Sequence, residues 1–320
     1  MAPFSVLVTP QAMFQRRSEV EDFFGDGYVI EFSGAPINDQ AKLKERLADK
    51  DAAVLGVEKI DSGILAAAPN IKILSRFGTG YDSIDTTAAK TRGVRVAATP
   101  ARLAHQAVAR HAIALTLALA HNIKSSSTAM TQGRWERQAN LSLAGKTFGV
   151  LGLGGSGVAT AMLAQRLGMR IAYWNRGPKP EGERQGWSVY ATPEALFEAS
   201  DIVSIHMAGG SDVENFLNAD RLALLKGKFL INTARGNLID EAALFSLLEA
   251  GVIRGAGLDV FKNEPIKDLS ARLVALPNVI ATPHVASFDA ESVLATARAA
   301  VANVRAVLEG RLDQAENLVA

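Results

Sequence analysis

Three titratable side chains follow three consecutive predicted strands in the second half of the chain. Arg235 follows FLINTA, Glu264 follows GLDVF and His284 follows VIATP. Because the carboxyl ends of strands in an open α/β sheet face the ligand crevice, we expect these side chains at one edge. A guanidinium can bind a carboxylate bidentately and polarise an adjacent carbonyl, and an imidazole paired with a carboxylate can protonate that carbonyl oxygen. Each residue alone would be an ordinary surface charge or helix cap, but together they favour an acid–base site.

A glycine-rich segment upstream predicts a nucleotide-binding turn. The sequence TFGVLGLGGSG runs from a short apolar strand into a helix expected at 158–167, and it contains the spacing G-x-G-x-x-G. The first glycine permits a tight turn, the second lets the backbone approach phosphate, and the third lets the helix pack on the strand. The helix N-terminus offers N–H groups and a partial positive charge to an anion. The expected pyrophosphate-binding residues are Gly152, Gly154, Gly155, Ser156 and Gly157.

The end of the next strand predicts which dinucleotide binds. Proteins that bind NAD usually place Asp or Glu there, where the carboxylate accepts a hydrogen bond from the ribose 2′-hydroxyl. This chain has Asn175 followed by Arg176, with Lys179 close by in sequence. No carboxylate would repel a 2′-phosphate, and a guanidinium could bind it. We therefore expect NADP as the preferred cofactor, with NAD as the alternative if Arg176 only stacks on adenine.

Composition and charge favour a two-domain enzyme of the cytoplasm. The chain has 320 residues, of which 48% are hydrophobic, and its net charge is +1. This length exceeds one ordinary core, and the charge balance offers no electrostatic basis for binding nucleic acid or an anionic membrane. The absence of cysteine excludes disulfides, a thiol nucleophile and Cys-ligated zinc. We expect no secretory signal at the N-terminus, and the longest apolar stretch, 107–120, is too short to span a bilayer.

Short apolar runs alternate with helical patterns, which predicts parallel sheets built from βα units. We expect strands of a first group at 4–8, 52–57, 71–75 and 94–98, and of a second group at 147–151, 170–174, 202–205, 229–232, 257–260 and 279–281. Helices are expected at 40–48, 84–91, 102–123 and 290–310. The predicted fold is α/β, with two Rossmann-like doubly wound parallel-sheet domains and a cleft between them. The substrate-binding domain would comprise 1–100 and 286–320, and the dinucleotide-binding domain 101–285.

Several segments in the same order resemble the D-isomer-specific 2-hydroxyacid dehydrogenase family, in its branch of phosphoglycerate dehydrogenases and glyoxylate or hydroxypyruvate reductases. They are AAPNIKILSRFGTGYDSID, the approach to the glycine-rich turn, DIVSIHM, FLINTARGNLIDEAAL, GAGLDVFKNEP and LPNVIATPHVAS. The resemblance implies that Arg235 binds and polarises the substrate, that His284 is the acid–base and that Glu264 is its partner. It implies that Asp259 and the carbonyl of Thr233 help orient the nicotinamide, and we also expect His206 and Ala234 to contact the cofactor.

The resemblance also implies a substrate contact from the first domain. The backbone of the loop after the strand at 71–75 would hold the substrate carboxylate. Members that act on phosphorylated acids carry an arginine cluster in this domain, and Leu55 stands where one of those arginines would be, although Arg76 remains. A small 2-keto acid such as glyoxylate or hydroxypyruvate is therefore expected. The predicted substrate-binding residues are Leu55, Gly56, Arg76, Phe77, Gly78, Thr79 and Gly80, with Val57 beside the side-chain pocket.

The chain departs from the family at two places. Met207-Ala208-Gly209-Gly210 replaces the usual x-Pro after His206, and Arg110 replaces a common Glu. His105, His111 and His121 have no metal-ligand pairing, so we expect them to be structural or surface residues and expect no metal site. A homodimer built on the helix at 102–123 and the segment up to Ser142 is expected, because that helix is apolar on more than one face.

Three alternative functions remain open from the sequence. A phosphoglycerate dehydrogenase would use the same catalytic residues. An oxidase of formate or phosphite on the same scaffold would have no ketone oxygen to protonate, so the Arg–Glu–His set disfavours it. A nucleotide-sensing corepressor could keep the fold and all three residues without catalysing a reaction.

Overall fold

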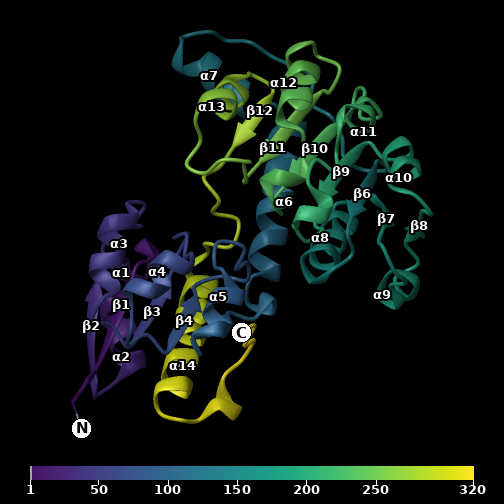
Figure 1. Ribbon diagram of the computed structural model, residues 1–320. Helices are drawn as coiled ribbons and strands as arrows, with labels where there is room; N and C mark the ends of the chain where they lie inside the picture. Colours follow the sequence, from purple (N-terminus) through teal and green to yellow (C-terminus); the bar gives the residue numbers. More distant parts are fainter. Residues whose placement is uncertain (1) are drawn as a thin grey trace. The chain divides into compact units, whose positions relative to one another are not determined.

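The computed structural model describes residues 2–320, apart from the side chain of Ser211. The chain divides into two compact units, and each is built on its own parallel sheet (Figure 1). Unit 1 comprises Met1–Leu103 and Asp289–Ala320, and unit 2 comprises Ala104–Phe288. The predicted fold class, α/β with two parallel sheets, is confirmed. Within residues 2–320, no helix combines the length and apolar character needed to cross a membrane.

Unit 1 contains a five-stranded sheet in the order β2-β1-β3-β4-β5. Its strands are β1 (Phe4–Val8), β2 (Tyr28–Phe32), β3 (Ala52–Leu55), β4 (Ile73–Arg76) and β5 (Arg95–Ala98). Its helices are α1 (Gln11–Gln15), α2 (Arg17–Phe24), α3 (Gln40–Leu47), α4 (Ser62–Ala67), α5 (Thr86–Thr91), η1 (Ala101–Leu103), α14 (Ala290–Leu308) and η4 (Leu312–Gln314).

Helices cover both faces of this sheet, because its strands are apolar on both sides. Successive residues of β1 point to opposite faces: Val6 and Val8 face a core shared with α1, α2 and α14, whereas Leu7 faces the core under α3, α4 and α5. The last helix, α14, also accepts a hydrogen bond from the Ser75 hydroxyl at the carbonyl of Ala300, 2.9 Å away. Helix α14 therefore packs in the core of unit 1.

Unit 2 contains a seven-stranded sheet in the order β12-β11-β10-β9-β6-β7-β8. Its strands are β6 (Thr147–Leu151), β7 (Arg170–Trp174), β8 (Ser188–Val189), β9 (Ile202–Ile205), β10 (Phe229–Asn232), β11 (Gly255–Leu258) and β12 (Val279–Ala281). Its helices are α6 (His105–Ala120), α7 (Ile123–Thr131), α8 (Gly155–Arg166), α9 (Pro180–Arg184), α10 (Pro193–Ala199), η2 (Ser211–Val213), α11 (Ala219–Ala223), η3 (Gly236–Leu238), α12 (Glu241–Glu249) and α13 (Asp268–Ala275).

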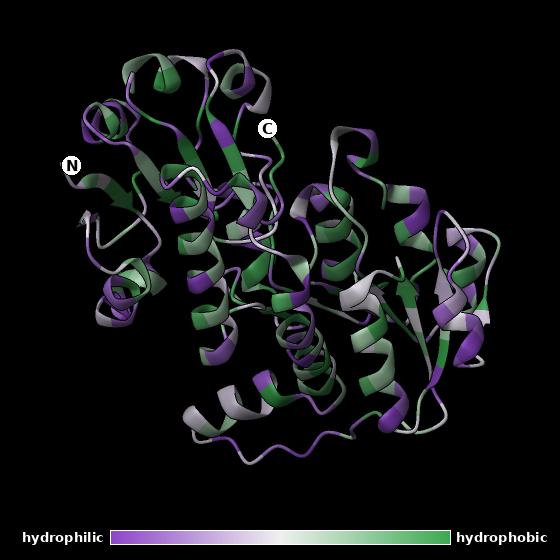
Figure 2. Ribbon diagram, turned by 90° about the horizontal axis from the view of Figure 1, so that it is seen from below, coloured by the Kyte–Doolittle hydropathy of each residue, from purple (hydrophilic) through white to green (hydrophobic). Residues whose placement is uncertain are grey.

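The strand order of unit 2 reverses direction between β6 and β9, which makes their carboxyl ends the topological switch point where ligands bind in open sheets. Helices α6 and α8 cover one face of the sheet, and α10 to α13 cover the other. Hydrophobic residues accordingly gather on the strands and on the helix faces turned toward them (Figure 2).

Three local features differ from the sequence-based expectations. The helix expected at 102–123 is present as α6 but is shorter, because Asn122 adopts a left-handed conformation with φ of +52° and separates α6 from α7. Strands β2 and β8 are additional; β8 has only two residues and both are exposed, so its apolar signal is weak. Strand β11 begins and ends two residues earlier than expected, which places Asp259 directly after the strand.

Candidate active site

The glycine-rich turn connects β6 to α8, and two of its glycines are required by close contacts. Gly152 has φ of +96°, and a Cβ added there would lie 2.7 Å from the backbone nitrogen of Met207. A Cβ on Gly157 would lie 2.3 Å from the carbonyl oxygen of Gly152. Gly154 faces open space, with nothing within 4 Å of its Cβ position. Gly152 and Gly157 are therefore packed against neighbouring backbone, whereas the space beside Gly154 is empty, as a bound phosphate requires.

The first turn of α8 is free to bind an anion. Its N-cap, Gly154, provides no side-chain hydrogen bond, and α8 has twelve residues over which backbone dipoles align. Gly155 has a packing role as well, because a Cβ there would overlap the ring of His105. Ser156 lies in the same turn and is half-buried. These features fit a dinucleotide pyrophosphate.

Two buried polar atoms near the switch point have no hydrogen-bond partner in the structure. One is Nδ1 of His206, directly after β9, and the other is Oγ1 of Thr233, directly after β10. Burial lowers the pKa of His206 to about 4, so its imidazole is neutral, and its Nε2 lies 2.8 Å from the hydroxyl of Ser204. Because buried polar groups are normally paired, both atoms fit a site that takes a polar ligand.

Arg235 lies at the end of a tightly held turn. The buried side chain of Asn232 accepts a hydrogen bond from the Ala234 N–H at 3.0 Å and donates one to the Arg235 carbonyl at 2.9 Å. A Cβ on Gly236 would fall 1.9 Å from the carbonyl carbon of Phe261, so only glycine lets this turn approach the loop after β11. The sequence therefore places the Arg235 turn directly against the segment that carries Glu264.

The loop that departs from the family pattern also contacts this turn. A Cβ on Gly209 would lie 2.7 Å from Cγ of Arg235, and the Asn237 side chain donates a hydrogen bond to the Gly210 carbonyl at 3.4 Å. Gly209 thus lets the loop pass close to the Arg235 side chain. The guanidinium itself donates to the carbonyl of Ala234 at 2.8 Å.

His284 and Glu264 form a hydrogen-bonded pair. Nδ1 of His284 lies 2.7 Å from Oε2 of Glu264, and their side chains are 43% and 32% exposed, so the pair is open to a small ligand. Because a carboxylate only accepts, Nδ1 carries the hydrogen and Nε2 is left to face a substrate. His284 has φ of +55°, a left-handed conformation that costs a non-glycine residue about 1–3 kcal/mol and persists only when neighbouring contacts enforce it.

Glu264 is ionised because its neighbours outweigh its burial. Burial alone would raise the pKa of Glu264, but the hydrogen bond and charge of His284, the N–H of Phe261 and the charge of Arg235 together lower it below its ordinary value. The Phe261 N–H donates to Oε1 of Glu264 at 2.9 Å. The electrostatic coupling links all three predicted catalytic residues in unit 2.

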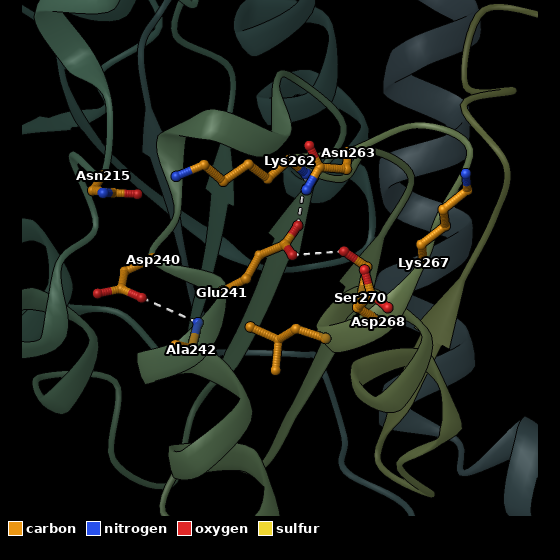
Figure 3. Close-up of a pocket in the computed structure, with 10 residues that line it drawn as sticks. Asn215, Asp240, Glu241, Ala242, Lys262, Asn263, Lys267, Asp268 and Ser270 are labelled. Carbon is orange, nitrogen blue, oxygen red and sulfur yellow. Dashed lines mark hydrogen bonds between the residues drawn. The ribbon is translucent and has the colours of Figure 1, made fainter.

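A second glutamate, Glu241, binds the loop that carries Glu264. Glu241, at the start of α12, accepts hydrogen bonds from the Lys262 N–H at 2.6 Å and from the Ser270 hydroxyl at 2.7 Å (Figure 3). Its side chain points into the pocket between these two segments, and only 9% of the residue is exposed. We assign this pocket no ligand, because the buried carboxylate is already bonded to the protein and fixes the segment two residues before Glu264.

Asp259 is fully buried, and its carboxylate binds the segment around His284. Oδ1 accepts from the Thr282 hydroxyl at 2.5 Å and from the Val285 N–H at 2.9 Å, and Oδ2 accepts from the Ala286 N–H at 2.9 Å. These contacts give Asp259 a structural role in this loop. Its contact with nicotinamide stays a prediction.

The end of β7 carries the residues expected to choose the cofactor. The side chain of Asn175 accepts from the Leu153 N–H of the glycine-rich turn at 3.0 Å and donates to the Gly177 carbonyl at 2.9 Å. Arg176 is largely exposed and forms an ion pair with Asp212 of η2 at 3.5 Å. A carboxylate therefore lies near this position, but it comes from η2 rather than from β7 and it pairs with the arginine.

The predicted substrate-binding residues of unit 1 lie at the carboxyl ends of β3 and β4. The side chain of Leu55 is fully buried in the core, so a ligand at this edge would meet backbone and not the leucine side chain. Arg76 donates to the carbonyls of Phe77 at 2.6 Å and Leu55 at 3.4 Å. The Gly56 N–H donates to the buried Glu58 carboxylate at 2.8 Å.

The loop after β4 has the backbone freedom expected of it. Gly78 has φ of +137°, and its N–H donates to the Thr99 hydroxyl at 3.1 Å. Phe77 is buried, Thr79 is exposed and Gly80 is half-buried. Substrate binding by these residues stays a prediction.

Four residues with clear positions at the site were not assigned roles from the sequence: His111, Asn232, Glu241 and Thr282. Asn232 and Thr282 are the polar residues at or just after the ends of β10 and β12, which is a signal available in the sequence. His111 and Glu241 could not be found this way, because their partners are 171 and up to 29 residues away in the chain. In the described part of the chain, no three His, Cys, Asp or Glu side chains cluster as metal ligands.

The fold and site together are those of a dinucleotide-binding oxidoreductase, and comparison with known proteins identifies the family. A protein-family model described as 'D-isomer specific 2-hydroxyacid dehydrogenase, NAD binding domain' matches residues 113–286, which is more than half of the chain. The protein belongs to the D-isomer-specific 2-hydroxyacid dehydrogenase family. This finding confirms the resemblance drawn from the sequence motifs.

Three relatives show the range of activities in this family. The chain is 35% identical over 281 residues to the glyoxylate reductase of Thermococcus litoralis, and the match covers 84% of each protein. It is 32% identical to an NADPH-dependent glyoxylate/hydroxypyruvate reductase of Sinorhizobium meliloti, solved with NADP and malonate, with a TM-score of 0.83 and coverage of 100% and 97%. A D-lactate dehydrogenase of Aquifex aeolicus, solved with NAD and lactic acid, is 25% identical, with a TM-score of 0.86 and 98% coverage of both chains.

Proposed function

We propose that this protein reduces a small 2-keto acid of the glyoxylate or hydroxypyruvate type to the D-2-hydroxy acid, with NADPH preferred over NADH. The observation that carries this proposal is the hydrogen bond between Nδ1 of His284 and Glu264, coupled electrostatically to Arg235 beside a dinucleotide-binding turn. The relatives named as glyoxylate and hydroxypyruvate reductases support the reaction class.

The reaction follows from which atoms the protein leaves available. The bound nicotinamide would supply a hydride to the carbonyl carbon. The Arg235 guanidinium would bind the substrate carboxylate and polarise the adjacent carbonyl. Since Nδ1 of His284 is held by Glu264, Nε2 would donate the proton to the carbonyl oxygen as the carbon–oxygen double bond becomes a single bond. Glu264 stabilises the imidazolium before that transfer, and the neutral imidazole is reprotonated from solvent.

The proposed substrate class rests on size and charge. Leu55 offers no cation for a phosphate, and the guanidinium of Arg76 already bonds to two backbone carbonyls. These contacts support a small unphosphorylated acid over phosphoglycerate. A steady-state screen of 2-keto acids with both reduced cofactors tests the proposal: glyoxylate or hydroxypyruvate should give the highest kcat/KM. Turnover of 3-phosphohydroxypyruvate alone would replace the proposed substrate, and turnover of no keto acid would refute the proposed reaction.

The Glu264→Gln variant should change the pH dependence of reduction. Reduction requires the protonated imidazole, so the rate falls as pH rises and the imidazole loses its proton. Although burial alone would raise it, the pKa of Glu264 is lowered by its hydrogen bond to His284 and by nearby positive charge, so its carboxylate is ionised and would stabilise that protonated form, whereas Gln removes the charge. We expect the alkaline fall of kcat/KM to move to lower pH. Profiles measured for both proteins would contradict the pairing if they coincide.

We also propose a homodimer that involves α7 and the segment after it. Three large apolar side chains are exposed there: Trp135 at 76%, and Ile123 and Met130 at 56% each. Burying such side chains against a second copy would remove them from water. Light scattering at micromolar concentration should give twice the monomer mass for the wild type, and Trp135→Glu should shift it toward monomer. Val189→Glu alters an exposed apolar residue on β8 and should stay dimeric. A monomeric wild type would contradict this proposal.

A further inference from the structure

His111 begins a chain of hydrogen bonds that ends at the loop of His284. Its Nε2 lies 2.8 Å from the hydroxyl of Thr282, which lies 2.5 Å from Oδ1 of Asp259. The carboxylate of Asp259 in turn accepts the N–H groups of Val285 and Ala286, both at 2.9 Å. The chain therefore connects α6 to the residues on either side of His284.

The direction of each hydrogen bond follows from the chemistry of the groups. A buried carboxylate can only accept, so the Thr282 hydroxyl donates its hydrogen to Asp259. That hydroxyl then has only its lone pairs left, so Nε2 of His111 must carry a hydrogen and donate it. Nε2 of His111 also lies 3.5 Å from Oδ1 of Asp259. One arrangement of hydrogens satisfies every group, and loss of the hydroxyl or the imidazole would break it.

The register between α6 and β11 brings His111 to this position. A Cβ on Gly255 would lie 3.2 Å from the Leu119 side chain, and a Cβ on Gly257 would lie 2.9 Å from that of Leu115. Two residues of a strand span about 6.6 Å and four residues of a helix about 6 Å, so the next step of this register pairs residue 259 with residue 111. The small residues of β11, whose sequence is GAGL, let α6 approach the strand closely enough for His111 to bond directly to Thr282.

We propose that His111 and Thr282 are positioning residues, which act through Asp259 to hold His284 in its left-handed conformation with Nδ1 on Glu264. Besides the bonds to the carboxylate, the His284 N–H donates to the Asp259 carbonyl at 2.8 Å. Together these bonds enforce the φ of +55° at His284. The link to catalysis rests on the proposed function, whereas the link to the His284–Glu264 hydrogen bond does not.

The kinetic test compares three threonine variants. Thr282→Val keeps the shape and removes the hydroxyl, and it should lower kcat about tenfold to a hundredfold, the usual cost of a misplaced catalytic group, while cofactor Kd stays unchanged. Thr282→Ser keeps the hydroxyl and should stay near wild type. Thr116→Val is the matched control, because Thr116 is a fully buried threonine of α6 whose hydroxyl bonds only within the helix, to Ala112 at 2.8 Å. Equal kcat values for Thr282→Val and Thr116→Val would overturn the proposal.

A second measurement reads the position of His284 without turnover. The ¹⁵N chemical shifts of its imidazole, assigned by their loss in His284→Ala, report which ring nitrogen carries the hydrogen in the neutral form. Wild type and Thr282→Ser should hold it on Nδ1, and both Thr282→Val and His111→Phe should mix the two tautomers. An unchanged Nδ1–H form in His111→Phe and in folded Thr282→Val would overturn the proposal. A wild type that reduces no keto acid would refute the proposed function alone, since this spectrum would still decide the positioning role.

Discussion

The His284→Ala variant is expected to lose kcat by about a hundredfold to ten-thousandfold, the usual contribution of a positioned general acid. Nε2 is the ring nitrogen left free by the bond to Glu264, so no other group at the pair can donate the proton. The dinucleotide contacts are expected at the glycine-rich turn and at the ends of β7, β9 and β10, away from His284, so cofactor Kd should change little. Stopped-flow and steady-state rates, with cofactor titration by fluorescence, measure the two effects separately.

Arg235→Lys provides a comparison for this prediction. Lysine keeps the charge but not the planar fork of donors, so KM for the keto acid should rise together with a loss of kcat, unlike the kcat effect of His284→Ala. A His284→Ala enzyme that reduces the keto acid at close to the wild-type rate would show that another group supplies the proton. If His284→Ala instead loses cofactor binding, His284 acts in binding the cofactor and not in proton transfer.

The second large effect is expected in cofactor choice. A guanidinium paired with a 2′-phosphate gains about 1.5–3 kcal/mol, which corresponds to a preference for NADPH of about tenfold to a hundredfold in kcat/KM. The ion pair of Arg176 with Asp212 is exposed and worth at most about 1 kcal/mol, so Asp212 weakens this preference without cancelling it. The double variant Asn175→Asp, Arg176→Ala should prefer NADH, because it adds a ribose acceptor and removes the phosphate partner.

Asp212→Asn serves as the control for this mechanism. It frees Arg176 from its present partner, so it should raise the preference for NADPH several-fold in the wild-type background and have no effect once Arg176 is alanine. The measurement is kcat/KM with NADPH and with NADH at one keto-acid concentration series. Equal values, or a preference for NADH in the unmodified protein, would mean that the lack of a carboxylate at the end of β7 does not decide which cofactor binds.

Much of the site could be predicted because strand ends can be found in the sequence. Arg235, Glu264 and His284 each follow a short apolar run, and the carboxyl ends of parallel strands meet at one edge. The structure brings His284 and Glu264 within hydrogen-bond distance and places the charge of Arg235 close enough to act on Glu264. The glycine spacing likewise predicted where the backbone turns, and the contacts at Gly152 and Gly157 explain why those two positions need glycine.

The rest depends on side-chain directions and on distant partners. Leu55 ends β3 two residues before the end expected from the sequence, and its side chain points into the core. A shift of one residue along a strand would reverse that direction. His111 meets Thr282 only because α6 lies across β11 in one register, which the apolar pattern of the helix alone does not specify. The break at Asn122 was missed because asparagine adopts the left-handed conformation more readily than most residues, a local choice that hydrophobic periodicity does not report.

The most direct test of the central claim is the transfer of deuterium from the nicotinamide C4 position of labelled NADPH to hydroxypyruvate. The product is analysed by mass spectrometry and chiral chromatography. Catalysis by this site predicts D-glycerate that carries one deuterium on C2 in the wild type, with the amount formed in a fixed time reduced about a hundredfold or more in His284→Ala. L-glycerate, unlabelled glycerate, or no product with any small 2-keto acid would contradict it.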